Sequence, residues 1–148
     1  MNAIGDTAPV LVVRRRIAVP RERVFAAWLD SESLAQWMRP GDSTTATVTV
    51  DPRVGGGFRI VMDGPTHGAV EHHGEYLVID PPSLLSFTWI SRPTEHRATV
   101  VTIEFEERGS ETELILTHRG LPAKALEGHR NGWTDVVRLL DEVLSAAG

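Results

Sequence analysis

The sequence predicts an α+β protein in which one antiparallel sheet is covered by a long C-terminal helix. Three observations lead to this fold class. Apolar and polar side chains alternate with period two through most of residues 45–118, short turns separate these runs, and residues 131–148 carry apolar side chains at helical spacing. Strands joined by short turns pair antiparallel, and the apolar face of such a sheet must be covered. The C-terminal segment is the only predicted helix long enough to cover it.

The chain is expected to begin with a strand and two short helices. Residues 10–20 are rich in β-branched side chains and end at Pro20, which suits the first turn of a helix. Residues 21–30 carry apolar side chains at helical spacing. Ser31 is expected to cap a second short helix over residues 31–38.

Six further runs are predicted to be strands, namely residues 45–51, 57–64, 70–80, 84–90, 98–107 and 111–118. Because successive side chains of a strand point to opposite faces, the apolar positions identify the inner face. The predicted inward residues are Phe58, Ile60, Met62, Leu85, Phe87, Trp89, Val101, Ile103, Phe105, Leu114 and Leu116. His118 continues the apolar face of the last strand.

In residues 70–80 we expect Leu77 and Ile79 to face inward. The same alternation then places three polar side chains on the inner face, namely Glu71, His73 and Glu75. It places two others on the solvent side, namely His72 and Tyr76. A bulge at Gly74 would reverse this assignment.

The C-terminal helix is predicted to face the sheet with one apolar stripe, formed by His129, Trp133, Val136, Val137, Leu140 and Leu144. Gly128 and Gly132 lie beside this stripe, although each glycine inside a helix costs about 1 kcal/mol relative to alanine. Two missing side chains allow close approach of the backbone to the sheet or leave room for a ligand. We expect close packing, with ligand room as the alternative.

Composition and charge exclude several classes of function. The 148 residues are 41% hydrophobic and contain no cysteine, so a disulfide framework, a thiol nucleophile and a thiolate metal site are excluded. The formal charge of −5 disfavours nucleic-acid and anionic-membrane binding, and no apolar run is long enough for stable membrane insertion. The N-terminus does not resemble an export signal. We therefore expect a cytoplasmic protein with a flexible segment at 1–8 and a single domain at 9–148.

Several motifs carry a resemblance to a known family. They are Pro-x-x-x-Val-Phe-x-x-Trp from Pro20, Trp before Pro, Gly-Gly, Pro-Pro and Gly-Trp, in that order along residues 10–146. In these motifs the chain resembles the bacterial members of the activator of heat-shock-protein-90 ATPase homologue family. That family belongs to the START-like, birch-pollen-allergen-like (SRPBCC) superfamily. The resemblance implies a helix-grip fold, in which a curved antiparallel sheet wraps around a long C-terminal helix with a cavity between them.

The favoured function is binding of a small hydrophobic molecule, such as a lipid, a sterol or an aromatic polyketide, in that cavity. The expected sheet wall consists of Phe58, Ile60, Met62, Trp89, Phe105 and Leu116. The expected helix wall consists of Trp133, Val136, Val137 and Leu140. Candidate polar contacts are Arg15, Glu71, His73, His118 and His129. For Arg15, an ion pair with a glutamate at the rim is the favoured alternative to a clamp on a ligand carboxylate.

Two other functions remain open. A cyclase- or hydratase-like enzyme would use the same cavity, with His118 or Glu71 as general acid or base, because burial shifts both groups toward useful pKa values. A chaperone-interaction module is the second alternative that the family implies, although the eukaryotic activators have an additional N-terminal domain. We expect a binding protein rather than an enzyme, and no cofactor.

Glu71, His73, His118 and His129 together carry the nitrogen and carboxylate groups that a zinc site needs. The chain has no short-range ligand motif such as His-Glu-x-x-His, so we expect no metal.

Overall fold

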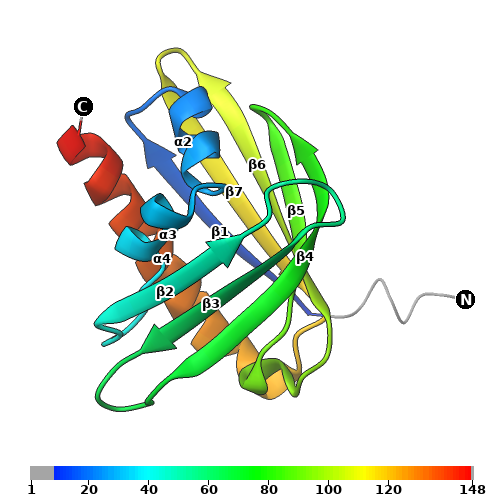
Figure 1. The fold of residues 1–148 in the computed structure, drawn as a ribbon. Helices are drawn as coiled ribbons and strands as arrows, with labels where there is room; N and C mark the ends of the chain where they lie inside the picture. Colours follow the sequence, from blue (N-terminus) through cyan, green and yellow to red (C-terminus); the bar gives the residue numbers. More distant parts are fainter. Residues whose placement is uncertain (1–8, 148) are drawn as a thin grey trace, which may run out of the picture.

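The computed structural model describes residues 9–147, so the segment at 1–8 that we expected to be flexible lies outside the described residues. Seven strands form one sheet: β1 (Val10–Ile17), β2 (Thr45–Val50), β3 (Gly57–Asp63), β4 (Val70–Asp80), β5 (Leu84–Trp89), β6 (Thr99–Arg108) and β7 (Glu111–Arg119). Their order is β1-β7-β6-β5-β4-β3-β2, and every neighbouring pair is antiparallel. β1 and β2 are therefore the two edges (Figure 1).

Within the described residues there are three α-helices and two short 3-10 turns, namely α2 (Arg21–Ala27), α3 (Ser31–Trp37), η1 (Arg92–Thr94), η2 (Ala123–Ala125) and α4 (Leu126–Ala147). The predicted cap of α3 is wrong by one residue, because Asp30 accepts a hydrogen bond from Ser33 N at 3.2 Å and Ser31 is the first helical residue. α4 begins at Leu126, so both of its glycines lie within the helix. None of the described helices combines the length and apolar character needed to span a bilayer.

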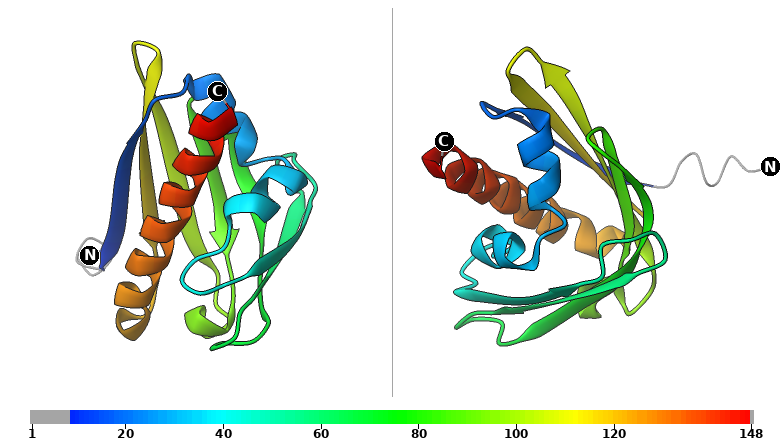
Figure 2. Two further views of the ribbon diagram at one scale, coloured as in Figure 1. Left: turned by 90° about the vertical axis from the view of Figure 1, so that its left-hand side faces the viewer. Right: turned by 45° about the horizontal axis from the view of Figure 1, so that its top comes forward.

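The sheet curves around α4, which lies along its concave side (Figure 2). α3 contacts both β2 and α4, and α2 contacts β6 and β7. The predicted α+β class and the helix-grip arrangement are confirmed by this architecture. The arrangement brings one apolar stripe of the helix against the apolar face of the sheet, as the period-two and helical patterns require.

The core consists of the predicted inward side chains. All members of the inward sets on β3, β5, β6 and β7 are buried, as are Trp133, Val136, Val137, Leu140 and Leu144 on α4. Aromatic rings join the elements through edge contacts, with centroids of Phe25 and Phe105 5.1 Å apart and those of Phe58 and Phe87 5.4 Å apart. The inner face is therefore correctly predicted for these four strands.

The predicted facing of β4 is wrong. Tyr76 and His72 are buried, whereas Glu71, His73, Glu75 and Leu77 are exposed. The pairing of β4 with β5 shifts register between Tyr76 and Val78, so this irregularity puts Ile79 and Tyr76 on the same side. Gly74 is not the site of this irregularity. A glycine is required there because the backbone passes close to β5, and a Cβ would lie 2.0 Å from Thr88 O.

Candidate ligand-binding site

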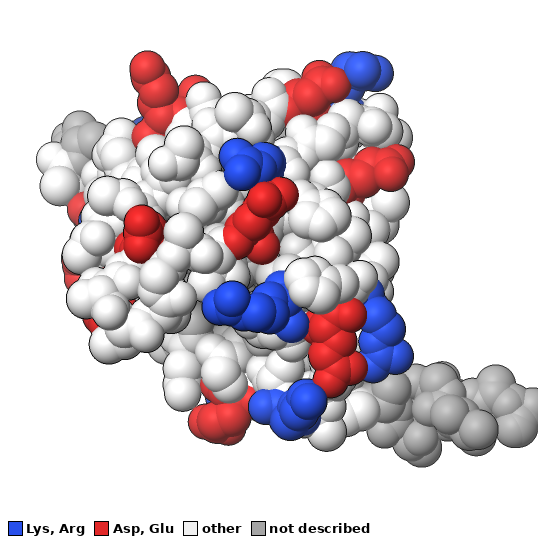
Figure 3. Space-filling view, turned by 60° about the horizontal axis from the view of Figure 1, so that its bottom comes forward, with Lys and Arg blue, Asp and Glu red and all other residues white. Residues whose placement is uncertain are grey.

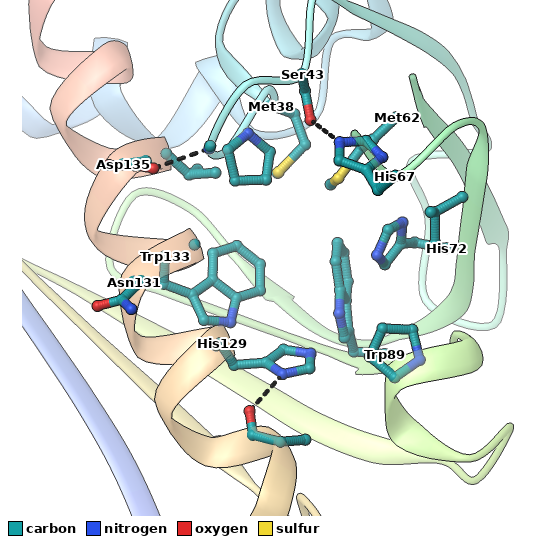
Figure 4. A pocket seen from close by; sticks show the side chains of 18 of the residues that line it. Met38, Ser43, Met62, His67, His72, Trp89, His129, Asn131, Trp133 and Asp135 are labelled. Atoms are coloured by element: carbon teal, nitrogen blue, oxygen red, sulfur yellow. Dashed lines mark hydrogen bonds between the residues drawn. The ribbon is translucent and has the colours of Figure 1, made fainter. Parts of the chain in front are cut away.

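A cavity of about 530 Å³ lies between the N-terminal half of α4 and the sheet. Its walls are mostly apolar and aromatic. The principal wall residues from the sheet are Met62, His72 and Trp89, and those from α4 are His129, Trp133 and Val136 (Figure 4). The ring centroids of Trp89 and Trp133 are 5.0 Å apart, so the sheet wall and the helix wall meet at these two side chains. A volume of this size is within the usual range of small-molecule sites, about 300–1,000 Å³.

Two loops form the mouth and are tied to their neighbours by hydrogen bonds. Gly41 N donates to Asp135 Oδ2 at 2.8 Å, which joins the α3–β2 loop to α4. His67 Nδ1 donates to Gly68 O at 2.6 Å, so in a neutral ring Nε2 accepts the hydrogen bond from Ser43 Oγ at 3.0 Å. The β3–β4 turn and the α3–β2 loop are therefore connected across one side of the mouth.

The two glycines of α4 border the cavity, and our expectation of close packing around them is wrong. A Cβ at Gly128 would meet no atom within 4 Å, and one at Gly132 would meet only Pro40 Cβ, at 3.6 Å. The space beside the apolar stripe is thus open rather than filled by backbone.

His118 lies behind Trp133, in a chain of hydrogen bonds that links Trp133 to the backbone of Trp89. The indole Nε1 of Trp133 donates to His118 Nδ1 at 3.0 Å, and an indole nitrogen can only donate. His118 must then carry its proton on Nε2, which donates to Thr99 Oγ1 at 2.7 Å, and Thr99 donates to Trp89 O at 2.6 Å. Burial lowers the pKa of His118 to about 3, and the nearby His129 acts in the same direction. The ring is therefore neutral and fully bonded.

His72 and His129 line the cavity from opposite walls. Burial lowers the pKa of His72 to about 4, with His129 adding to the effect and the carbonyls of Val70 and Ile60 opposing it. The pKa of His129 is also lowered by burial, against the opposing hydrogen bond from Nδ1 to Ala125 O at 2.9 Å. Both rings are consequently neutral near pH 7.

The structure brings five of the predicted binding residues to the cavity wall, namely Met62, Trp89, His129, Trp133 and Val136. Phe58 and Ile60 border a separate hollow of about 20 Å³. Phe105, Leu116, Val137 and Leu140 are buried in the packed core and do not line the cavity. The cavity is therefore confined to one end of the surface between α4 and the sheet.

The remaining polar candidates lie elsewhere. His73 and Glu71 are on the outer face of β4, where Glu71 pairs with Arg59 at 3.2 Å. Arg15 pairs with Asp141 on α4 at 2.9 Å, so it has an ion-pair partner within the protein, an aspartate rather than the expected glutamate.

The four candidate zinc ligands are not brought together, because two of them lie on the outer face of β4. Within residues 9–147 no group of histidine and carboxylate side chains is arranged to hold a metal ion.

Sequence reasoning missed several lining residues. His72 was assigned to the wrong face of β4, because alternation was extended from Leu77 and Ile79 across the register shift that follows Tyr76. Ser43, His67, Arg92 and Lys124 lie in or next to loops, where no periodicity indicates orientation. Met38 and Pro40, which follow α3, also line the cavity.

Comparisons with known proteins agree on the family. The model of the "Activator of Hsp90 ATPase homolog 1-like protein" family matches residues 18–145. The human "Activator of 90 kDa heat shock protein ATPase homolog 1" is 34% identical over 90 residues, which are 61% of this chain and 25% of the human protein. The chain thus spans about a quarter of the length of that relative.

Solved structures show the same fold. An AHSA1 protein from Silicibacter pomeroyi is 27% identical, with a TM-score of 0.78 over 95% of this chain and 100% of that one. An HSP90 activator from Plasmodium falciparum is 27% identical, with a TM-score of 0.74 over 92% and 96% of the two chains. A Rhodobacter sphaeroides protein, 23% identical, has a TM-score of 0.81 over 95% of each chain. Because the family model covers most of its length, this chain belongs to the Activator of Hsp90 ATPase homolog 1-like family.

Proposed function

We propose that this protein binds a small, mostly apolar molecule in the cavity between α4 and the sheet. The observation that carries the proposal is the cavity itself, about 530 Å³ of space lined by apolar and aromatic side chains at one end of a packed core. Side chains fill protein interiors to crystal-like density, and an opening of this size with mostly apolar walls is typical of a small-molecule site.

A ligand screen with a matched pair of variants tests the proposal. Fatty acids, sterols and aromatic polyketides are added in turn, and the melting temperature is measured, because a ligand of the folded state stabilises it by mass action. Gly132→Leu places a bulky side chain at the cavity wall, and Thr134→Leu places the same side chain on the exposed face of α4. We expect a thermal shift with at least one class for the wild type and for Thr134→Leu, and none for Gly132→Leu. The absence of a shift with every class in the wild type contradicts the proposal.

Stimulation of a chaperone ATPase is the second candidate. It is favoured by the 34% identity to the human activator and by the likeness to the Plasmodium falciparum HSP90 activator. The test is the ATP hydrolysis rate of purified chaperone with and without this protein. An unchanged rate at saturating protein rejects this candidate and leaves the binding proposal intact.

The two side chains expected to act as general acid or base are not placed to do so in this cavity. Both nitrogens of His118 are already bonded within the protein, and Glu71 is on the outer face of β4. Neither side chain lines the cavity.

A further inference from the structure

The turn between β5 and β6 forms part of the cavity rim and has a well-supported backbone. Glu95 N donates to Arg92 O at 2.8 Å, and Pro93 fixes one backbone dihedral within the same turn. Lys124, directly before α4, forms an ion pair with Glu95 at 3.1 Å. Arg92 therefore extends from a turn that is tied to the start of α4, and its side chain lines the cavity.

Of the described residues that line the cavity, Arg92, Lys124 and Asp135 carry a charge, and two of these three have partners within the protein. Lys124 pairs with Glu95, and Asp135 accepts a hydrogen bond from Gly41 N at 2.8 Å. Arg92 is exposed, and its guanidinium forms no ion pair or side-chain hydrogen bond with any residue in the range 9–147. The cavity thus has one free charge at its rim, and that charge is positive.

The surroundings of Arg92 are positive as well. Figure 3 shows basic side chains gathered around an acidic one at this end of the molecule. Glu95 has cations on two sides, Lys124 at 3.1 Å and Arg97 at 3.2 Å, and both lower the pKa of its carboxyl group. With Arg92 there are three cations for one carboxylate, in a chain whose formal charge is −5. This part of the rim therefore attracts an anion.

The inner part of the cavity has the opposite character. Burial lowers the pKa of His72 to about 4 and also lowers the pKa of His129, so both rings are neutral near pH 7. The neighbouring wall consists of the apolar side chains of Met62, Trp133 and Val136. A charged group placed there would lose its water without gaining a counter-ion, which is unfavourable. A ligand with a charge is therefore oriented with its apolar part inward and its charged group at the rim.

A carboxylate fits a single free guanidinium. The parallel N–H groups of arginine match the two oxygens of a carboxylate, and such charge-assisted hydrogen bonds are about twice as strong as neutral ones. An ammonium group would meet charges of its own sign at this part of the rim. Arg15, the arginine considered as a carboxylate clamp, is already paired with Asp141 at 2.9 Å. Arg92 is the arginine that is available to a ligand in the cavity.

Resting on the proposed function, we propose that the cavity binds an apolar molecule that carries one carboxylate group. The apolar body lies between Met62, Trp133 and Val136, and the carboxylate pairs with Arg92 at the rim.

Three probes with the same apolar body test this assignment: biphenyl-para-carboxylate, biphenyl-para-carboxamide and para-phenylbenzylammonium. The carboxylate and the carboxamide have nearly the same shape and differ in charge. Titration calorimetry of the wild-type protein at neutral pH and low salt should show about tenfold tighter binding of the carboxylate than of the carboxamide. The ammonium probe should bind most weakly. Added salt should reduce the advantage of the carboxylate, because an ion pair at an exposed rim is screened.

Variants assign the effect to one side chain. In Arg92→Gln the carboxylate should bind no more tightly than the carboxamide, and binding of the carboxamide should be unchanged. Arg92→Lys keeps the charge but not the parallel donors, so it should retain only part of the advantage. Arg119→Gln is the matched control, because it removes the same charge from an exposed residue that does not line the cavity. It should retain the full advantage.

The second cation of the rim provides a sharper comparison. Lys124 lines the same cavity, but its ammonium group is already paired with Glu95. Lys124→Gln should therefore reduce the advantage of the carboxylate by less than Arg92→Gln does. An equal or larger reduction would place the carboxylate at Lys124 and overturn the assignment to Arg92.

The outcomes separate this inference from the proposed function. Equal binding of the carboxylate and the carboxamide to the wild type, or an undiminished difference in Arg92→Gln, overturns the carboxylate assignment while the cavity remains a binding site. Failure of all three probes to bind overturns both. Because the wild-type ranking and its salt dependence need no variant, a variant that does not fold leaves the test decisive.

Discussion

The two ends of the surface between α4 and the sheet differ in what fills them. At the end near the C-terminus of α4, Phe105, Leu114 and Leu140 are at most 1% exposed, and Phe25 from α2 packs its ring edge against Phe105. At the other end the same helix and sheet border about 530 Å³ of open space, with loops and short turns at its rim. The difference teaches that the fold packs where α2 adds side chains to the concave face and stays open where none does.

Truncation at the packed end should have the largest effect. Phe105→Ala removes a ring that is 1% exposed and should lower the free energy of unfolding by about 3–5 kcal/mol, measured by urea denaturation. Met62→Ala, in the cavity wall, should cost about 2 kcal/mol, because part of its surface already lacks packed neighbours. Equal losses in the two variants would contradict the contrast between the ends.

Two buried histidines near the open end should make stability depend on pH. His72 and His118 have pKa values lowered from 6.5 to about 4 and about 3, so the folded state favours the neutral rings. An unfolded chain takes up these protons near pH 6.5. The stability that they contribute is therefore full above pH 6.5 and decreases as the pH falls toward the folded values.

By pH 5 each ring should have cost about 2 kcal/mol of unfolding free energy relative to pH 7. In urea titrations at both pH values, His72→Gln should reduce the decrease by about that amount. The adjacent His73→Gln, on the exposed face of β4, should leave it unchanged. An identical decrease in wild type and His72→Gln would show that His72 is not a buried neutral ring.

Two adjacent valines of α4 provide a finer comparison. Val136 and Val137 are each 1% exposed, but only Val136 lines the cavity. Val137→Ala should cost about 1 kcal/mol more than Val136→Ala, because it leaves a new void in a region that was fully packed. Chemical denaturation of both variants measures the difference, and a larger loss for Val136→Ala would place the packed region on the wrong side of the helix.

The smallest expected effect is a gain of stability. Gly128→Ala adds a methyl group that meets no atom within 4 Å, so improved helix propensity should raise the unfolding free energy by about 0.5–1 kcal/mol. Gly74→Ala serves as the opposite control, since its Cβ would collide with Thr88 O. A loss of stability in Gly128→Ala would indicate that the start of α4 is packed more closely than the structure shows.

The fold could be predicted from the sequence because two periodicities are strong: the alternation of apolar and polar side chains in the strands, and the helical spacing of apolar side chains in α4. Alternation identified the buried sets around Phe58, Trp89, Phe105 and Leu114, and helical spacing identified the stripe of α4. The exception is β4, where a register shift after Tyr76 reverses the facing and neither glycine nor proline occupies the irregular position. Extrapolating from Ile79 back along the strand therefore placed His73 inward instead of His72.

The residues that line the cavity were harder to predict from the sequence, for a different reason. Alternation shows which side chains face the helix, but it does not show where helix and sheet diverge. Phe105 and Trp89 have the same pattern in sequence, yet only Trp89 lines the cavity. The mouth is formed by Ser43, His67 and Arg92, whose orientations depend on loop geometry that no periodic pattern encodes.

The four tryptophans of the chain form a continuous series through the interior. Their ring centroids are separated by 4.7 Å from Trp37 to Trp28, 6.4 Å from Trp28 to Trp133 and 5.0 Å from Trp133 to Trp89. Excitation energy transfers readily between indoles this close, so light absorbed at the fully buried Trp37 is emitted in part from the cavity wall. The intrinsic fluorescence of the unlabelled protein is thus an optical reporter of what occupies the space beside Trp89 and Trp133.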